Sequence, residues 1–385
     1  MRYAASVLWV MALCGAAPVQ SAEHTAHARP ALSLGVAAAP SGALWIIGVD
    51  NAGRLFLQYT HDEGAHWSAP RVIDTGNDEI AADGESRPAL AFGPGGAVVI
   101  SYTQPLAKPY TGNIRLITSQ DGGVHFEPPL TLHDDRQQIT HRFASMAFDG
   151  HGVLQVLWID KRDAVRKDYA GAAVYGKESH DGGRHFGPDL KLADHSCECC
   201  RIALATAADG SLHALWRQVF TGSQRDHGFA PLADLGRGRE PVRATRDGWV
   251  LQACPHHGPG LSAARDGGWH AVWYGLREGV AAVRYGKLKA DGSPAAEPRT
   301  LPDPTAEHAD IASIGEQVAI VWRSYDGERS HLRAWISHDG GRRFELRELS
   351  SSTSDNDHPR LLRNGPYLQV IWRTTEGIEV HRVNP

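Results

Sequence analysis

Two short segments hold most of the residues that could do chemistry. One reads C-E-C-C and the other C-P-H-H. Together they contain Cys197, Cys199, Cys200, Cys254, His256 and His257. Thiolate and imidazole groups are ligands for soft and borderline metals, Cu(I) and Zn(II) among them. Because the C-x-C-C spacing differs from the C-x-x-C of zinc ribbons, we expect low-coordinate Cu(I) rather than zinc.

The same cysteines could instead form disulfides. Four cysteines remain if Cys14 leaves with a signal peptide, and an even count in an oxidising compartment is typical of disulfide bonding. Cys254 could pair with one cysteine of the first segment, and a labile disulfide could still open to bind metal. We also expect Arg201, which follows Cys200, to lower a thiol pKa.

Residues 1–22 are predicted to be a cleaved signal peptide. Arg2 precedes an apolar stretch at 4–19 that is too short for a stable anchor, and small residues follow at Ser21 and Ala22. The mature chain, 23–385, is therefore expected to be periplasmic or secreted. It has no apolar run of about 18 residues that would span a membrane. A net charge of -5 argues against nucleic-acid binding driven by basic charge.

A β-rich segment recurs seven times along the chain, with spacings near fifty residues. The segments are A-L-W-I-I-G-V-D at 43–50, A-V-V-I-S-Y-T at 97–103, L-Q-V-L-W at 154–158, L-H-A-L-W at 212–216, W-H-A-V-W at 269–273, V-A-I-V-W at 318–322 and L-Q-V-I-W at 368–372. Short strands and tight turns at such a period are the signature of a propeller. We predict a single all-β propeller domain of four-stranded blades, seven in number, with six as the alternative.

Four units also share a turn of the form Ser/Thr-x-Asp-x-Gly-x-x-Trp/Phe. The turns lie at 60–67, 119–126, 179–186 and 337–344. The Asp can bond backbone amides of the turn and the Gly permits unusual backbone angles, so we interpret the turns as structural. The pattern resembles the Asp-box, or BNR repeat, of sialidase-like propellers. The C-E-C-C and C-P-H-H-G-P segments further resemble a subgroup of exported bacterial proteins of this kind, which carries no assigned reaction.

Propeller topology predicts which residues share a face. Residues just before the first strand of each blade and just after the second meet at one mouth of the central channel. Those before the first strand are Arg29, Arg87, His141, Arg142, Cys199, Cys200, Arg201, His256, His257, His308, His358 and Arg360. Those after the second are Tyr102, Asp160, Arg217, Tyr274, Arg323 and Arg373. Ligands commonly bind at such mouths.

The resemblance to sialidases implies a second hypothesis, a glycoside hydrolase for acidic sugars. Such an enzyme needs an arginine cluster, a tyrosine nucleophile and an acid. Arg217, Arg323 and Arg373 are the candidates for the cluster, Tyr274 or Tyr102 for the nucleophile, and Asp160 for the acid. The Arg-Ile-Pro start of sialidases is missing, and no Glu is clearly paired with either Tyr.

We favour a metal-binding propeller, with the hydrolase second and a disulfide-stapled interaction scaffold third. The expected ligand at the mouth is a metal ion, copper foremost, or a small anion. A protein partner in metal delivery is the further expectation, since mouth arginines could dock an acidic partner.

Overall fold

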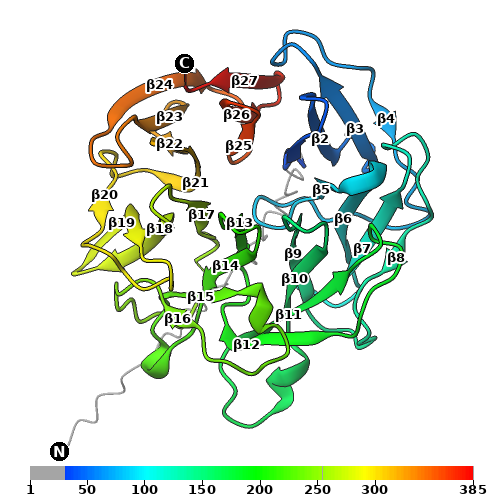
Figure 1. The fold of residues 1–385 in the computed structure, drawn as a ribbon, viewed down its shortest axis with the longest axis horizontal. Helices are drawn as coiled ribbons and strands as arrows, with labels where there is room; N and C mark the ends of the chain where they lie inside the picture. The colour runs from blue at the N-terminus through cyan, green and yellow to red at the C-terminus, as the bar shows by residue number, and fades with distance from the viewer. Residues whose placement is uncertain (1–30, 254, 385) are drawn as a thin grey trace, which may run out of the picture.

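The computed structural model describes residues 31–253 and 255–384, and its strands form seven antiparallel sheets arranged in a ring (Figure 1). Within these residues six sheets have four strands and the last has three, each following chain order from the inner to the outer edge. The predicted seven-bladed β-propeller is confirmed, and the six-bladed alternative is wrong.

The first two sheets have short inner and outer strands, whereas the strands of the third sheet have seven or eight residues each. The first sheet contains β1 (Gly35–Ala38), β2 (Leu44–Val49), β3 (Leu55–Thr60) and β4 (Arg71–Val72). The second contains β5 (Ala89–Phe92), β6 (Val98–Pro105), β7 (Gly112–Ser119) and β8 (Leu130–Thr131). The third contains β9 (His141–Phe148), β10 (Leu154–Asp160), β11 (Ala172–Ser179) and β12 (Leu190–Ser196).

The remaining sheets complete the ring. The fourth contains β13 (Ala203–Thr206), β14 (Leu212–Arg217), β15 (His227–Pro231) and β16 (Val242–Arg243). The fifth contains β17 (Gly260–Ala263), β18 (Trp269–Arg277), β19 (Val280–Leu288) and β20 (Arg299–Thr300). The sixth contains β21 (Glu307–Ile314), β22 (Gln317–Tyr325), β23 (Ser330–Ser337) and β24 (Glu345–Ser352), and the seventh β25 (Arg360–Asn364), β26 (Tyr367–Arg373) and β27 (Ile378–Arg382).

The first strand of every sheet faces the centre of the ring. Each lies beside the first strand of the next sheet, and β25 lies beside β1, so the ring closes between the last sheet and the first. Because these strands run in the same direction, the loops that lead into them meet at one mouth of the channel, as the sequence predicted.

The second strand of each sheet supplies the core between sheets. The repeated marker residues on these strands are all buried: Ile46, Ile100, Trp158, Trp216, Trp273, Trp322 and Trp372. A buried indole N–H needs an acceptor. Trp322 Nε1 donates to Asp303 Oδ2 at 2.8 Å, and Trp158 Nε1 donates to Asp160 Oδ2 at 2.8 Å. The core therefore combines apolar burial with satisfied polar groups.

The repeated Asp turns connect the third strand to the fourth in four sheets. In the turn after β11, Ser179 Oγ donates to Asp181 Oδ1 at 2.9 Å and accepts from the Gly183 amide at 2.9 Å. Asp181 Oδ1 also accepts from the His185 amide at 2.9 Å. The Asp carboxylates therefore accept hydrogen bonds from backbone amides of their own turns.

The predicted signal peptide at 1–22, Arg29 and Cys254 lie outside the described residues. In the part of the chain that is described, no helix is both long enough and apolar enough to cross a membrane.

Replacement of Ser179 by Ala should destabilise the fold. The substitution leaves the buried Gly183 amide without its acceptor, so we expect the free energy of unfolding to fall by about 1–2 kcal/mol. Denaturant unfolding measures this change. The neighbouring His180→Ala, at a side chain that is 73% exposed, should leave stability unchanged; an equal loss in both variants would contradict the role given to Ser179.

Candidate functional site

A buried carboxylate, Glu85, organises the mouth of the channel. It accepts hydrogen bonds from the Arg201 guanidinium at 2.9 Å and from the Arg201 and Gly258 amides at 3.2 and 3.1 Å. His308 Nδ1 lies 3.2 Å from Glu85 Oε1, and His358 Nδ1 lies 3.8 Å from the same atom. Five segments thus meet at the Glu85 side chain. They are the loops that lead into the second, fourth, fifth and seventh sheets, and strand β21 of the sixth.

The charge of Glu85 is maintained by its partners. Burial alone would raise the pKa of this carboxyl group, but the charge of Arg201 and the hydrogen bond from His308 hold it well below its usual range. Glu85 is therefore an anion that is fully compensated by the groups around it.

Four aromatic rings form a stack beside this carboxylate. The Tyr274 and His257 ring centroids are 4.3 Å apart, those of His257 and His308 are 4.3 Å apart, and those of His308 and His358 are 3.4 Å apart. Burial and the neighbouring His308 lower the pKa of His257 to about 3, and burial also lowers the pKa of His308. The imidazoles of this stack are therefore neutral near pH 7.

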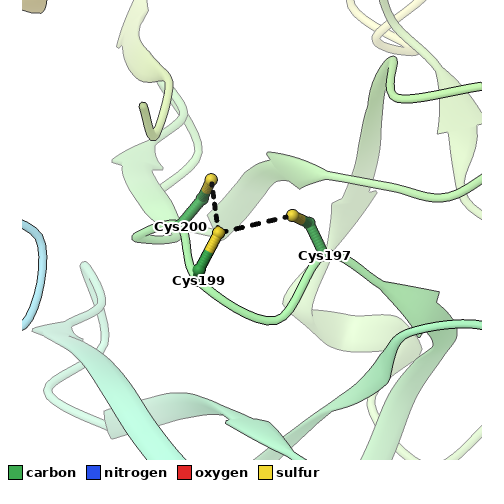
Figure 2. Close-up of side chains that lie close together, drawn as sticks. All are labelled: Cys197, Cys199 and Cys200. Carbon is green, nitrogen blue, oxygen red and sulfur yellow. Dashed lines mark hydrogen bonds between the residues drawn. The ribbon is translucent and has the colours of Figure 1, made fainter. Parts of the chain in front are cut away.

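Three buried cysteines occupy the loop between β12 and β13. Figure 2 shows the sulfur of Cys199 between those of Cys197 and Cys200. The Sγ–Sγ distances from Cys199 to Cys197 and to Cys200 are both 3.8 Å, and all three sulfurs lie within 4.8 Å of one another. A disulfide bond is about 2.0 Å long, so these three sulfurs are not bonded to one another.

The buried Arg217 guanidinium acts on the Cys200 thiol. The Cys197 thiol and burial raise the pKa of Cys200 well above its usual value, and the Arg217 guanidinium opposes that rise. The Arg201 guanidinium is bound to Glu85 at 2.9 Å, and the lowering of a thiol pKa by Arg201 stays a prediction.

Arg217 is a buried guanidinium held by backbone carbonyls. Its Nη2 donates to the carbonyls of Tyr274 at 2.7 Å and His257 at 3.0 Å, and its Nη1 donates to that of Arg225 at 3.0 Å. The Trp249 ring centroid lies 5.4 Å from the guanidinium carbon. Arg217 is 1% exposed, and carbonyl dipoles alone do not neutralise a cation, so anionic thiolates nearby would stabilise it.

A cavity adjoins the cysteine loop on its outer side. Its volume is about 540 Å³, and Cys199 and His256 line it together with Lys161, Glu198 and Phe143. Lys161 Nζ donates to Glu198 at 2.8 Å across the cavity wall. Although Cys199 is only 5% exposed, its side chain borders a space that a small ion or ligand could enter.

The predicted metal ligands divide between two places. The three cysteines of the first segment group together, whereas His257 groups with Glu307 and His308 within 4.8 Å. His256 lines the cavity beside Cys199. Cys254, the remaining predicted ligand, lies outside the described residues.

Asp160, predicted as an acid, is fully buried at the end of β10. It accepts from Arg162 Nη2 at 2.7 Å and Nε at 3.0 Å, and from the Trp158 indole. His141 Nε2 lies 3.7 Å away, and the His133 ring stacks on that of His141 at 3.7 Å. All of these contacts lie within a buried network.

The other predicted hydrolase residues are distributed around the ring. Tyr274 and Arg217 adjoin each other beside the cysteine loop. Arg323 donates to Glu307 Oε1 at 2.7 Å and to the Asn356 carbonyl at 3.0 Å, and it lines a separate cavity of about 860 Å³. Arg373 lies 3.5 Å from the Val49 carbonyl. The three arginines therefore have different partners in three sheets.

Sequence reasoning missed two carboxylates at the mouth. Glu85 stands in D-G-E-S-R-P, and Glu307 stands in A-E-H directly before His308. Both precede or begin a first strand, which is the position that propeller topology brings to the channel mouth. An acidic residue at such a position therefore indicates a carboxylate at the channel mouth.

Neither a protein-family model nor a curated protein matches this sequence. Among solved structures, a PL25 ulvan lyase is 11% identical with a TM-score of 0.58, covering 92% of this chain and 94% of the lyase. The polysaccharide lyase Uly1 is 10% identical with a TM-score of 0.56, covering 92% and 90%. A Hadza microbial sialidase is 15% identical with a TM-score of 0.51, covering 87% and 74%. Such identities show a shared propeller fold, one that glycosidases and polysaccharide lyases use.

The histidine pair beside Asp160 predicts a pH dependence of stability. Burial and the nearby His141 lower the pKa of His133 to about 4. Between that value and the unfolded value of about 6.5 the unfolded chain binds a proton that the folded chain does not, so stability falls as pH falls. His133→Gln should flatten the slope by up to about 1.4 kcal/mol per pH unit in that window.

Denaturant unfolding at several pH values between 4 and 7 tests this expectation. The exposed Gln138→Ala in the same loop removes no titrating group and should keep the slope of the original protein. A slope unchanged by His133→Gln would show that this histidine does not titrate as its burial implies.

Proposed function

We propose that this protein is an exported β-propeller that holds a soft metal ion, copper(I), through Cys197, Cys199 and Cys200. The observation that carries the proposal is the spacing of the three buried sulfurs. Two sulfurs each about 2.3 Å from one metal lie about 3.8–4.0 Å apart at angles of about 109–120°, which is close to both distances at Cys199. The spacing of these three sulfurs therefore suits a shared ion rather than disulfides among them.

The surroundings favour copper(I) over harder ions. Thiolate is a soft ligand, and the loop offers three sulfurs in a largely apolar cluster with Ile202 and Trp216. Cysteine-bound metal carries net negative charge, which the carbonyl-held Arg217 would compensate. His256, at the cavity beside Cys199, is available to an incoming ion.

Metal binding at this site must displace protons. Because the pKa of Cys200 is raised in the metal-free protein, binding converts a neutral thiol to a thiolate and releases its proton. Affinity should therefore fall as pH falls. The adjacent cavity supports a role in receiving or delivering an ion, with a small ligand or a protein as the donor.

Metal content under anaerobic, reducing conditions tests the proposal. We expect the protein purified with Cu(I) to hold near-stoichiometric copper and to show thiolate-to-copper charge-transfer absorption, and Cys199→Ser to lose at least ten-fold in affinity because one of three sulfurs is removed. Thr206→Ala, at an exposed position on the adjoining strand, is the matched control. A folded, reduced protein without bound metal would refute the site.

The alternative is an enzyme of the sialidase type acting on acidic sugars. The cavity of about 860 Å³ that is lined by Arg323, Tyr325 and His358 favours it, and the structural neighbours include a sialidase and polysaccharide lyases. Against it, Arg323 is already paired with Glu307. Burial and the hydrogen bond to Asp78 also raise the pKa of Tyr102, which opposes its use as a nucleophile.

We expect the protein to release no sialic acid from a reporter glycoside, because its arginines do not converge. A colorimetric release assay measures this. Release that Arg323→Ala abolishes, and that the exposed Arg329→Ala retains, would instead establish the hydrolase.

A further inference from the structure

We infer that the channel mouth holds a second, thiolate-free site for a divalent cation, formed by His257, His308 and Glu307. Each residue offers one ligand atom, and the three atoms lie within 4.8 Å of one another. Two imidazoles and one carboxylate are a donor set for Zn(II) and other borderline ions. This inference stands independently of the cysteine site.

Glu85 gives His308 the tautomer that a metal ligand needs. His308 Nδ1 lies 3.2 Å from Glu85 Oε1, and since the carboxylate can only accept, Nδ1 carries the proton. The lone pair is then on Nε2, which lies 4.0 Å from Glu307 Oε2. A carboxylate that orients a histidine through its second nitrogen is the usual outer partner of a metal-binding histidine.

Glu307 presents one oxygen that its neighbours leave open. Arg323 Nε donates to Oε1 at 2.7 Å, so Oε2 is the atom directed at His308. A separation of 4.0 Å is too long for a hydrogen bond. Two ligands that each lie about 2.1 Å from one ion at tetrahedral angles are about 3.4 Å apart, so a small movement of the Glu307 side chain would complete the site.

His257 contributes a buried nitrogen that lacks a partner among the described residues. Its Nδ1 is buried and receives no hydrogen bond there, and an unsatisfied buried polar atom costs free energy that an ion could recover. Stacking on Tyr274 and His308 fixes the plane of the ring. The ring of His257 is therefore held in place while its Nδ1 makes no hydrogen bond among the described residues.

The backbone at the site is held in an uncommon conformation. His308 has φ 51°, in the left-handed region that few residues other than glycine adopt. Such strain persists where the surrounding contacts require it and is concentrated at functional sites. Here it places His308 between His257 and His358, with Glu85 at its Nδ1.

Charge balance indicates what would accompany the ion. Glu85 and Glu307 are already matched by Arg201 and Arg323, so a divalent cation would add uncompensated positive charge. Glu307 and Arg323 both line the cavity of about 860 Å³. A small carboxylate or another anion in that cavity would restore the balance, so we expect the ion to bind more tightly when such an anion is present.

Cobalt(II) is the probe that separates the two sites. A cobalt ion held by nitrogen and oxygen gives d–d absorption without the sulfur-to-metal charge-transfer band of a thiolate site. In a protein in which Cys197, Cys199 and Cys200 are all replaced by Ser, we expect one equivalent of Co(II) to bind with d–d bands alone. Glu307→Gln in the same background should weaken that binding at least ten-fold, whereas the exposed Glu328→Gln should not.

A second measurement covers the case in which the protein without these three cysteines fails to fold. In the otherwise unchanged protein, Zn(II) should shift the imidazole nitrogen resonances of His257 and His308, and Glu307→Gln should abolish those shifts. Absence of shifts at saturating Zn(II), or cobalt binding indifferent to Glu307→Gln, would overturn the inference. The sulfur-to-metal charge-transfer band reports only the cysteine site, so failure of that site and failure of this inference give different results.

Discussion

The mouth of this propeller depends on one buried carboxylate. Glu85 comes from the loop before the second sheet, yet it accepts hydrogen bonds from Arg201 and Gly258 and orients His308 on the far side of the channel. Breaking a buried pair by removing one partner typically costs about 3–5 kcal/mol, because the other charge is left alone. Through these hydrogen bonds Glu85 holds Arg201, which directly follows the cysteine loop, and His308, which belongs to the ring stack.

The remainder of the ring is stabilised by contacts within and between neighbouring sheets. Because the second strands and the Asp turns supply these contacts, the entrance loops can hold cysteines, histidines and buried carboxylates. Tryptophans on the second strands pack between neighbouring sheets, and the Asp turns close on their own backbone at the other edge. Neither feature requires a particular residue at the start of a first strand. A repetitive scaffold thus leaves its entrance loops open to chemistry, as is common where function is placed on a rigid fold.

The periodic elements were predictable from sequence because each depends on nearby residues. The seven repeats of the second strand, five of them marked by tryptophan, predicted seven blades, and propeller topology then predicted the shared face. The partners at the mouth were not predictable in the same way, since Glu85 meets Arg201 and His308 across 116 and 223 residues. The contacts between Glu85 and these residues form only when the ring of sheets closes. The binding of Arg201 to Glu85 is such a contact, because nothing near Arg201 in the sequence indicates it.

The two proposed sites differ in donor chemistry but share a structural link. The thiols lie in a buried apolar loop suited to a soft ion, whereas the imidazoles and Glu307 suit a borderline one. Arg201 directly follows Cys200 and binds Glu85, and Glu85 in turn fixes the tautomer of His308. The same ion pair therefore anchors the chain directly after the cysteine loop and sets the protonated nitrogen of His308. Two sites of different donor chemistry thus depend on one buried carboxylate for the positions of their residues.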